Sequence, residues 1–294
     1  MNSVETPSYQ SNRHMLPEST HLGMVSLQVS QLERSLDYYQ QVIGLRLLER
    51  TETTAILGSF GTSTPLLALH ERQGINPVPR RGRLGLYHFA ILLPNRAELG
   101  KFLKHLAEIG AYAGMSDHLF SEALYLTDPD GLGIEVYADR PRSSWQYKEG
   151  EIVGATIPLD TQSVIQAAGN ESWHGMPQGT VIGHIHFYVN DLAKAEAFYH
   201  QGLGFDVVIR SYPGALFVSA GGYHHHIGLN TWAAGAAISG DDDARLLSWE
   251  LSLGSQQAID ETVQRLRSAG FSPEQSAEGW QLKDPWGSLV RFTV

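Results

Sequence analysis

Short apolar runs rich in β-branched and aromatic residues recur along this chain and are separated by amphipathic stretches of helical period. The runs at 85–94 and 124–137 predict buried strands. Between them, apolar positions at helical spacing over 96–109 predict a helix that ends at Gly110. This part of the chain is therefore expected to fold as a strand, a helix and further strands.

The same order of elements is repeated, with conserved spacing, in the second half of the chain. The equivalent pairs Leu32 and Leu192, Tyr39 and Tyr199, Gly44 and Gly204, and Gly110 and Gly270 are each 160 positions apart. The Asp-Pro-Asp-Gly segment at 128–131 recurs as Asp-Pro-Trp-Gly at 284–287, with an offset of 156 that also relates Glu135 to Arg291. Fixed offsets of this kind indicate an internal duplication. Each half contains two strand–helix–strands units, so we expect an α+β fold of four βαβββ modules at 21–72, 83–140, 180–232 and 245–294.

A chain of 294 residues with 42% hydrophobic content is long enough for two domains with proper cores. We expect these at 21–140 and 180–294, each with two modules. The segment 141–179, which shows little period-2 alternation, is predicted to be a long linker that packs across the surface. Residues 1–20 are polar and lack the apolar core of a secretory signal, which predicts a tail.

Charge and cysteine content exclude several classes of function. The formal net charge of −10 argues against nucleic-acid and anionic-membrane partners. The absence of cysteine excludes disulfides, thiolate metal sites and cysteine nucleophiles. No apolar run approaches the ~18 residues of a membrane span. A cytoplasmic protein is expected, with a homo-oligomer as a candidate assembly.

Polar residues stand at core positions of predicted strands in only two of the four modules. His88 and Glu135 lie in the first and last strands of the second module, and His184 begins the third. The equivalent positions of the first and fourth modules hold Met24, Ser248 and Arg291. A buried carboxylate needs a cation or several hydrogen-bond donors, so Glu135 requires a partner.

Two neutral imidazoles and one carboxylate suit Fe(II) or Mn(II) and leave coordination positions open for substrate and dioxygen. Calcium prefers more oxygen ligands than this set provides. Two alternatives remain at this point. Glu135 could pair with Arg140 or Arg83, and His186, two residues along the same strand face, competes with His184 as a ligand.

Several segments of the chain resemble the vicinal oxygen chelate superfamily, and more narrowly the catechol 2,3-dioxygenase group of extradiol ring-cleaving enzymes. The segments that carry the resemblance, which spans 21–294, are Ile182-Gly183-His184-Ile185-His186, Gly222-Tyr223-His224-His225-His226, Asp117-His118, Tyr125-Leu126-Thr127-Asp128-Pro129-Asp130-Gly131 and Ile134-Glu135-Val136-Tyr137. The resemblance implies mixed sheets that form cup-like half-barrels. It also implies meta cleavage of a small aromatic diol by O2 at an Fe(II) site, with Mn(II) as an alternative.

The resemblance also implies a role for each matching residue. His88, Glu135 and His184 match the metal ligands. Tyr125 matches a tyrosine that hydrogen-bonds a substrate oxygen, and His118 matches a histidine near the bound ring. His225 matches the histidine that shuttles a proton, although the sequence does not separate it from His224 and His226.

The best-known extradiol enzymes carry both catalytic modules in the C-terminal half, whereas here the ligand-bearing modules are the second and third. We therefore infer that these two modules pair to form one cup, because halves that closed on themselves would split the site. Two alternative functions are a glyoxalase-like lyase or isomerase that uses Ni, Zn or Mn, and a binding protein that sequesters a small molecule.

Overall fold

All four sequence repeats fold into one strand, one helical segment and three further strands. The structure is a computed structural model that describes residues 15–294, so most of the predicted tail lies outside the described residues. The first module consists of β1 (His21–Val29), α1 (Leu32–Gln41), β2 (Arg46–Arg50), β3 (Thr54–Gly58) and β4 (Pro65–Glu71). The second consists of β5 (Gly85–Leu92), α2 (Arg96–Glu108), β6 (Gly114–Asp117), β7 (Ser121–Thr127) and β8 (Gly133–Asp139).

The second half of the chain repeats this order. The third module contains β11 (Val181–Tyr188), α4 (Leu192–Glu196), the π-helix η2 (Ala197–Leu203), β12 (Asp206–Ile209), β13 (Ala215–Ser219) and β14 (Ile227–Asn230). The fourth contains β15 (Arg245–Ser252), α5 (Gln256–Ser268), β16 (Glu274–Ser276), β17 (Gly279–Lys283) and β18 (Leu289–Thr293). The connection between the halves forms η1 (Arg142–Ser144), β9 (Tyr147–Lys148), β10 (Glu151–Ile152) and α3 (Thr161–Ala167).

The modules combine across the two sequence halves to make two eight-stranded mixed sheets. The second and third modules form one sheet in the order β12-β13-β14-β11-β5-β8-β7-β6. The first and fourth form the other in the order β16-β17-β18-β15-β1-β4-β3-β2. The central pairs, β11 with β5 and β1 with β15, are antiparallel. The predicted pairing of modules two and three is therefore confirmed.

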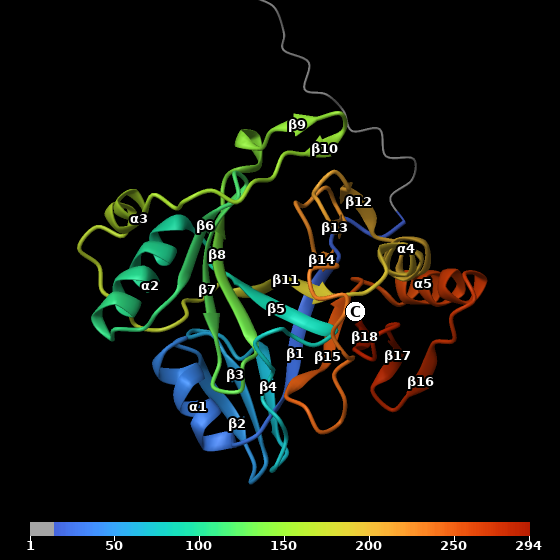
Figure 1. Cartoon of the computed structure of the whole chain (residues 1–294), viewed down its shortest axis with the longest axis horizontal. Coiled ribbons are helices and arrows are strands. Elements are labelled where there is room, and N and C mark those ends of the chain that lie inside the picture. Colours follow the sequence, from blue (N-terminus) through green and yellow to red (C-terminus); the bar gives the residue numbers. More distant parts are fainter. Residues whose placement is uncertain (1–14) are drawn as a thin grey trace, which may run out of the picture.

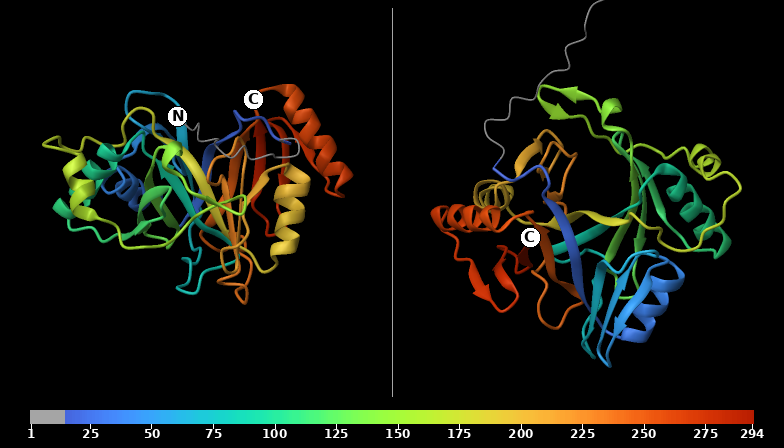
Figure 2. Two further views of the ribbon diagram at one scale, coloured as in Figure 1. Left: turned by 90° about the horizontal axis from the view of Figure 1, so that it is seen from above. Right: turned by 180° about the vertical axis from the view of Figure 1, so that it is seen from behind.

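The sheet of modules two and three curls into a half-barrel. In Figure 1, β6–β8 and β12–β14 stand on opposite sides of β5 and β11, with α2 and α3 on one flank and α4 and α5 on the other. The two views of Figure 2 show the same separation of the flanking helices. No helix within residues 15–294 is both long and apolar enough to cross a bilayer.

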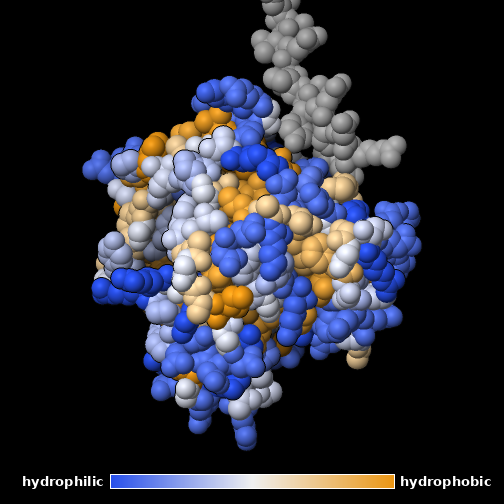
Figure 3. Space-filling view, turned by 45° about the vertical axis from the view of Figure 1, so that its right-hand side comes forward, coloured by the Kyte–Doolittle hydropathy of each residue, from blue (hydrophilic) through white to orange (hydrophobic). Residues whose placement is uncertain are grey.

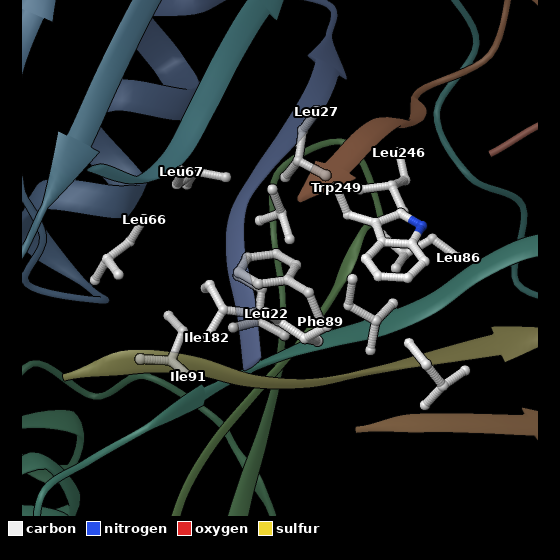
Figure 4. Close-up of a cluster of buried hydrophobic side chains, with 14 of the residues drawn as sticks. Leu22, Leu27, Leu66, Leu67, Leu86, Phe89, Ile91, Ile182, Leu246 and Trp249 are labelled. Atoms are coloured by element: carbon white, nitrogen blue, oxygen red, sulfur yellow. The ribbon is translucent and has the colours of Figure 1, made fainter. Parts of the chain in front are cut away.

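The main hydrophobic core is shared by the two sheets and the helices that pack on them, and each strand turns alternate side chains toward it. Residues of both sheets meet in this core, including Leu22, Leu27, Phe89, Ile182 and Trp249 (Figure 4). On the outer face shown in Figure 3, hydrophilic residues dominate the periphery and hydrophobic residues gather around the middle. The strand faces turned away from the shared core are thus free to line a cavity.

Repeated local signals account for the agreement between the predicted and observed helices. Asn95 and Ser255 cap α2 and α5 by accepting hydrogen bonds from backbone N–H groups three residues on. Gly110 and Gly270 follow these helices with left-handed φ angles of 68° and 87°. The helix ends at these positions therefore followed from the sequence alone.

A tyrosine–aspartate hydrogen bond connects the two modules within each half. Tyr39 donates to Asp128 Oδ2 over 3.1 Å, and Tyr199 donates to Asp284 Oδ2 over 2.8 Å. The other oxygen of each aspartate accepts two backbone N–H groups of its own turn. The repeated Asp-Pro-x-Gly segments are therefore turn structures that also link neighbouring modules.

Burial raises the pKa of Asp128 to about 7 and that of Asp284 to about 6. The folded protein thus holds these protons more tightly than the unfolded chain, whose aspartates titrate near ~3.9. Each protonated carboxyl therefore stabilises the fold fully at a pH below the unfolded pKa. This stabilisation is lost as the pH rises through the folded pKa. We expect the unfolding free energy of the wild type, relative to Asp128→Asn, to fall between about pH 4 and pH 7. Urea titrations of both proteins across this range measure it, and a constant difference would contradict the assignment.

Candidate metal centre

His184, Ala90 and Glu135 lie in one row across the curled sheet. Strand pairing places His184 of β11 opposite Ala90 of β5, and Ala90 beside Glu135 of β8. Tyr125 of β7 continues the row beyond Glu135. All four side chains therefore lie on the same face of the sheet, and the small Ala90 leaves space between His184 and Glu135.

His88 completes the cluster from the same face of β5, two residues before Ala90. Next to it stands Gly133, where a Cβ atom would lie 2.2 Å from the carbonyl oxygen of Tyr87. Any side chain at this position would therefore force the two strands apart. Glycine lets β5 and β8 approach closely at the level of His88.

The ligand atoms of His88, Glu135 and His184 converge. Glu135 Oε2 lies 3.0 Å from His88 Nε2 and 3.2 Å from His184 Nε2, and one ligand atom of each residue falls within 4.8 Å of the others. All three residues are buried, with at most 4% of their surface exposed. This is the only such group of three found among residues 15–294.

Burial and mutual charge set the protonation of the cluster. Burial lowers the pKa of both His88 and His184, so both rings are neutral at pH 7 and have lone pairs available. Burial alone would raise the pKa of Glu135, but His184 and His88 outweigh it and hold this pKa well below its usual range. The three side chains together therefore carry one negative charge.

The unpaired nitrogen of His88 fits a metal ion. His88 Nε2, the ring nitrogen that faces Glu135, is buried and makes no hydrogen bond with any described residue, although it lies 3.0 Å from Glu135 Oε2. Buried polar atoms are normally paired, and a cation bound between Glu135 and the two Nε2 atoms would give His88 Nε2 a partner. The arginine alternative is not realised, because Arg140 pairs with Asp117 and Glu122, and Arg83 pairs with Asp243.

Tyr125 and His118 form a hydrogen-bonded pair on the cavity wall beside the cluster. The His118 Nδ1–H group donates to the carbonyl oxygen of Ala155 over 2.7 Å, since a carbonyl can only accept. In the neutral ring, Nε2 is then an acceptor for the Tyr125 hydroxyl, which lies 2.6 Å away. The proton of Tyr125 is thus directed at His118, and its oxygen lone pairs remain available to a ligand in the cavity.

Of the three consecutive histidines, the structure places only His225 on the wall of this cavity. Its ring centre is 4.2 Å from that of His184. His224 and His226 are buried elsewhere, and His226 Nδ1 accepts the backbone N–H of Ala220. The three histidines precede β14, which begins at Ile227. The alternation of side chains along a strand therefore does not determine which of their rings faces the cavity.

A hydrogen-bonded chain that sequence analysis missed fixes the tautomer of His225. His224 Nε2–H donates to Asp139 Oδ1 over 2.9 Å, which in the neutral ring leaves His224 Nδ1 as an acceptor. His225 Nδ1 lies 2.8 Å from this atom and must therefore donate to it. His225 Nε2 then carries no proton. Asp139 is the last residue of β8, the strand of Glu135 and Tyr137, but no spacing signal in the sequence connects it to the triplet.

The segment predicted as a linker also contributes to the site. Gly154, Ala155 and Thr156 line the cavity, and Ile157 pairs with Asp117 in an isolated bridge. His186, the alternative ligand, also lines the cavity, but its Nε2 lies 3.0 Å from the side-chain amide of Asn230 and it is not part of the converging group. The structure thus favours His184, as the repeat alignment did.

Comparison with known proteins identifies relatives of the whole chain. The family model described as Glyoxalase/Bleomycin resistance protein/Dioxygenase superfamily matches residues 21–136 and 181–292. A protein of Bacillus subtilis (strain 168) named catechol-2,3-dioxygenase is 46% identical over 282 residues, which is 94% of this chain and 98% of that protein.

Two solved structures share the fold at low sequence identity. One, from Bacillus subtilis subsp. subtilis str. 168, superposes with a TM-score of 0.62 at 14% identity and covers 92% of this chain and 84% of its own. Glyoxalase I from Zea mays gives a TM-score of 0.53 at 16% identity and covers 93% of this chain and 92% of its own. Together with the family match over both halves, these likenesses show that the chain belongs to the Glyoxalase/Bleomycin resistance protein/Dioxygenase superfamily.

Proposed function

We propose that the protein is an extradiol dioxygenase that cleaves a catechol-type substrate with O2 at an Fe(II) centre. The observation that carries the proposal is the convergence of His88, Glu135 and His184 on one wall of a cavity. The relative named catechol-2,3-dioxygenase, which matches nearly the whole chain, supports the same chemistry. The expected product is a ring-opened hydroxymuconic semialdehyde. A cytoplasmic location and a homo-oligomeric assembly stay predictions of the sequence.

His88, Glu135 and His184 would hold the iron, and the same ligand set also suits Mn(II). Bound there, Fe(II) would supply the Lewis acidity and the redox capacity that cleavage of a catechol by dioxygen requires. Its two positive charges would be balanced by Glu135 and by one deprotonated substrate oxygen. The protein side chains thereby favour a monoanionic catechol in the cavity.

Tyr125 and His118 would orient the substrate. Because the Tyr125 hydroxyl donates to His118, its oxygen can accept a hydrogen bond from a substrate hydroxyl. Burial raises the pKa of Tyr125 well above its ordinary value, so the phenol stays protonated. The pair therefore acts as a hydrogen-bonding site next to the metal ligands.

His225 would move the proton during ring cleavage. Its unprotonated Nε2 is the atom that can take a proton from a substrate hydroxyl, since Nδ1–H is held by His224. Asp139 and His224 would be positioning residues that keep the ring in this tautomer. The single carboxylate and the neighbouring Tyr125–His118 pair favour ring cleavage over a glyoxalase-like lyase or a sequestering protein.

Metal binding can be tested separately from turnover. We expect one Fe(II) or Mn(II) per chain, with a rise in Tm on metal addition, because an ion that binds only the folded state stabilises it. Glu135→Gln should lose more than about 100-fold in affinity, since even outer-shell partners contribute about 10–100-fold. His186→Gln, next to the cluster but outside it, is the matched control. Calorimetric titration of metal-free protein measures both variants, and equal losses would contradict the ligand assignment.

Activity is tested with iron-loaded protein, catechol and air-saturated buffer. We expect stoichiometric oxygen uptake together with a yellow product. Iron-loaded protein that consumed no oxygen with catechol or its alkyl derivatives would overturn the proposed function.

Loss of the Asp139–His224 hydrogen bond should slow turnover without weakening substrate binding. General acid–base groups contribute about 10²–10⁴-fold to rates, so His225→Gln should lower kcat in this range and Asp139→Asn by about 10-fold or more. Tyr223→Phe is the control, because it removes a hydrogen bond to the same Asp139 oxygen and leaves the bond between His224 and Asp139 in place. Steady-state kinetics give kcat and KM. A change confined to KM would argue against a role in proton transfer.

A further inference from the structure

The cavity beside the metal ligands is larger than a single benzenediol ring requires. Its volume is about 370 Å³. A cavity of about 150 Å³ is enough to hold benzene. The remaining space can therefore accommodate a substituent of about the size of a second ring.

The outer part of this cavity has aromatic walls. Tyr87 of β5, Tyr212 ahead of β13 and Trp232 after β14 lie at its partly exposed rim. The ring centre of Trp232 is 6.1 Å from that of Tyr87 and 6.3 Å from that of Tyr212. Phe217 continues this wall inward, 5.0 Å from the ring of His225. Aromatic faces at these distances form a surface on which an apolar or aryl group can pack.

No lysine or arginine side chain lines this cavity, all of whose lining residues belong to the described part of the chain. Nearby cations are engaged elsewhere: Arg140 pairs with Asp117 and Glu122, and Arg96 pairs with Glu122. Glu135 is the only acidic residue in the wall. A second anion in the cavity would therefore find no charged partner, and an unpaired buried charge is strongly disfavoured.

From these observations we propose that the substrates are uncharged catechols that carry an apolar alkyl or aryl substituent, and that catechols with a carboxylate side chain are rejected. This inference rests on the proposed function. The metal charge is already balanced by Glu135 and one catechol oxygen. A side-chain carboxylate would leave the occupied cavity with a net negative charge against the aromatic wall.

The test compares 3,4-dihydroxyphenylacetate with its methyl ester, which share the ring and differ in charge. We expect kcat/KM for the acid to be at least about 100-fold lower than for the ester. The reason is that an uncompensated buried charge lowers affinity by about 100-fold or more. Titration calorimetry of the iron-loaded protein under nitrogen should show the same ratio in Kd, independently of turnover. Unsubstituted catechol and a phenylcatechol complete the series, and the phenyl compound should have the lowest KM.

The outcomes separate the two proposals. Absence of turnover with every catechol would overturn the proposed function. Turnover of catechol with equal constants for acid and ester would overturn this inference and leave the proposed function intact.

A positive charge added to the wall should weaken the preference for the ester. Thr156 is exposed at the rim, and its hydroxyl lies 3.2 Å from that of Tyr212. Thr156→Arg should raise the acid-to-ester ratio of kcat/KM by about 10-fold, since a hydrogen bond to a charged group contributes about a tenfold step in affinity. Thr156→Met, which loses the same hydrogen bond without adding charge, should leave the ratio unchanged. An equal change in both variants would contradict the electrostatic explanation.

Discussion

The antiparallel pairing of β5 with β11 is the contact on which the candidate site depends. It joins modules from opposite halves of the chain and sets His184 opposite Ala90. The parallel pairing of β5 with β8 then places Glu135 next in the row. A slip of one residue in either pairing would turn these side chains to the opposite face, because side-chain direction alternates along a strand. The register of two strand pairs thus controls the whole cluster.

The sheet of modules one and four has the same strand pairing but lacks the two histidines and the glutamate of the cluster. Glu250 stands beside Arg291 in the row that corresponds to Ala90 and Glu135. Its carboxylate accepts the backbone N–H of Met24 over 3.0 Å, at the position that corresponds to His184. A backbone hydrogen bond in this sheet therefore takes the place that the converging side chains have in the other.

Around the site, hydrogen-bonded chains decide which atoms can act on a ligand. Ala155 directs the proton of Tyr125 toward His118, and Asp139 directs that of His225 toward His224. Each chain begins at a group that can only accept a hydrogen bond: the carbonyl oxygen of Ala155 in one and the ionised carboxylate of Asp139 in the other. The cavity therefore presents oxygen and nitrogen lone pairs to a substrate, which matches the two hydroxyl donors of a catechol.

The sequence by itself determined the modules, the helix ends and the three converging residues. The 160-residue offset located the four repeats, and the contrast between Glu135 and Arg291 at equivalent positions singled out the second and third modules. These features are local or periodic, so one chain without coordinates is sufficient to find them. Only the tertiary structure decided the contribution of the segment 154–156, the choice of His225 within the triplet and the connection to Asp139. Each of these depends on contacts between segments far apart in the chain, which no repeat or periodicity encodes.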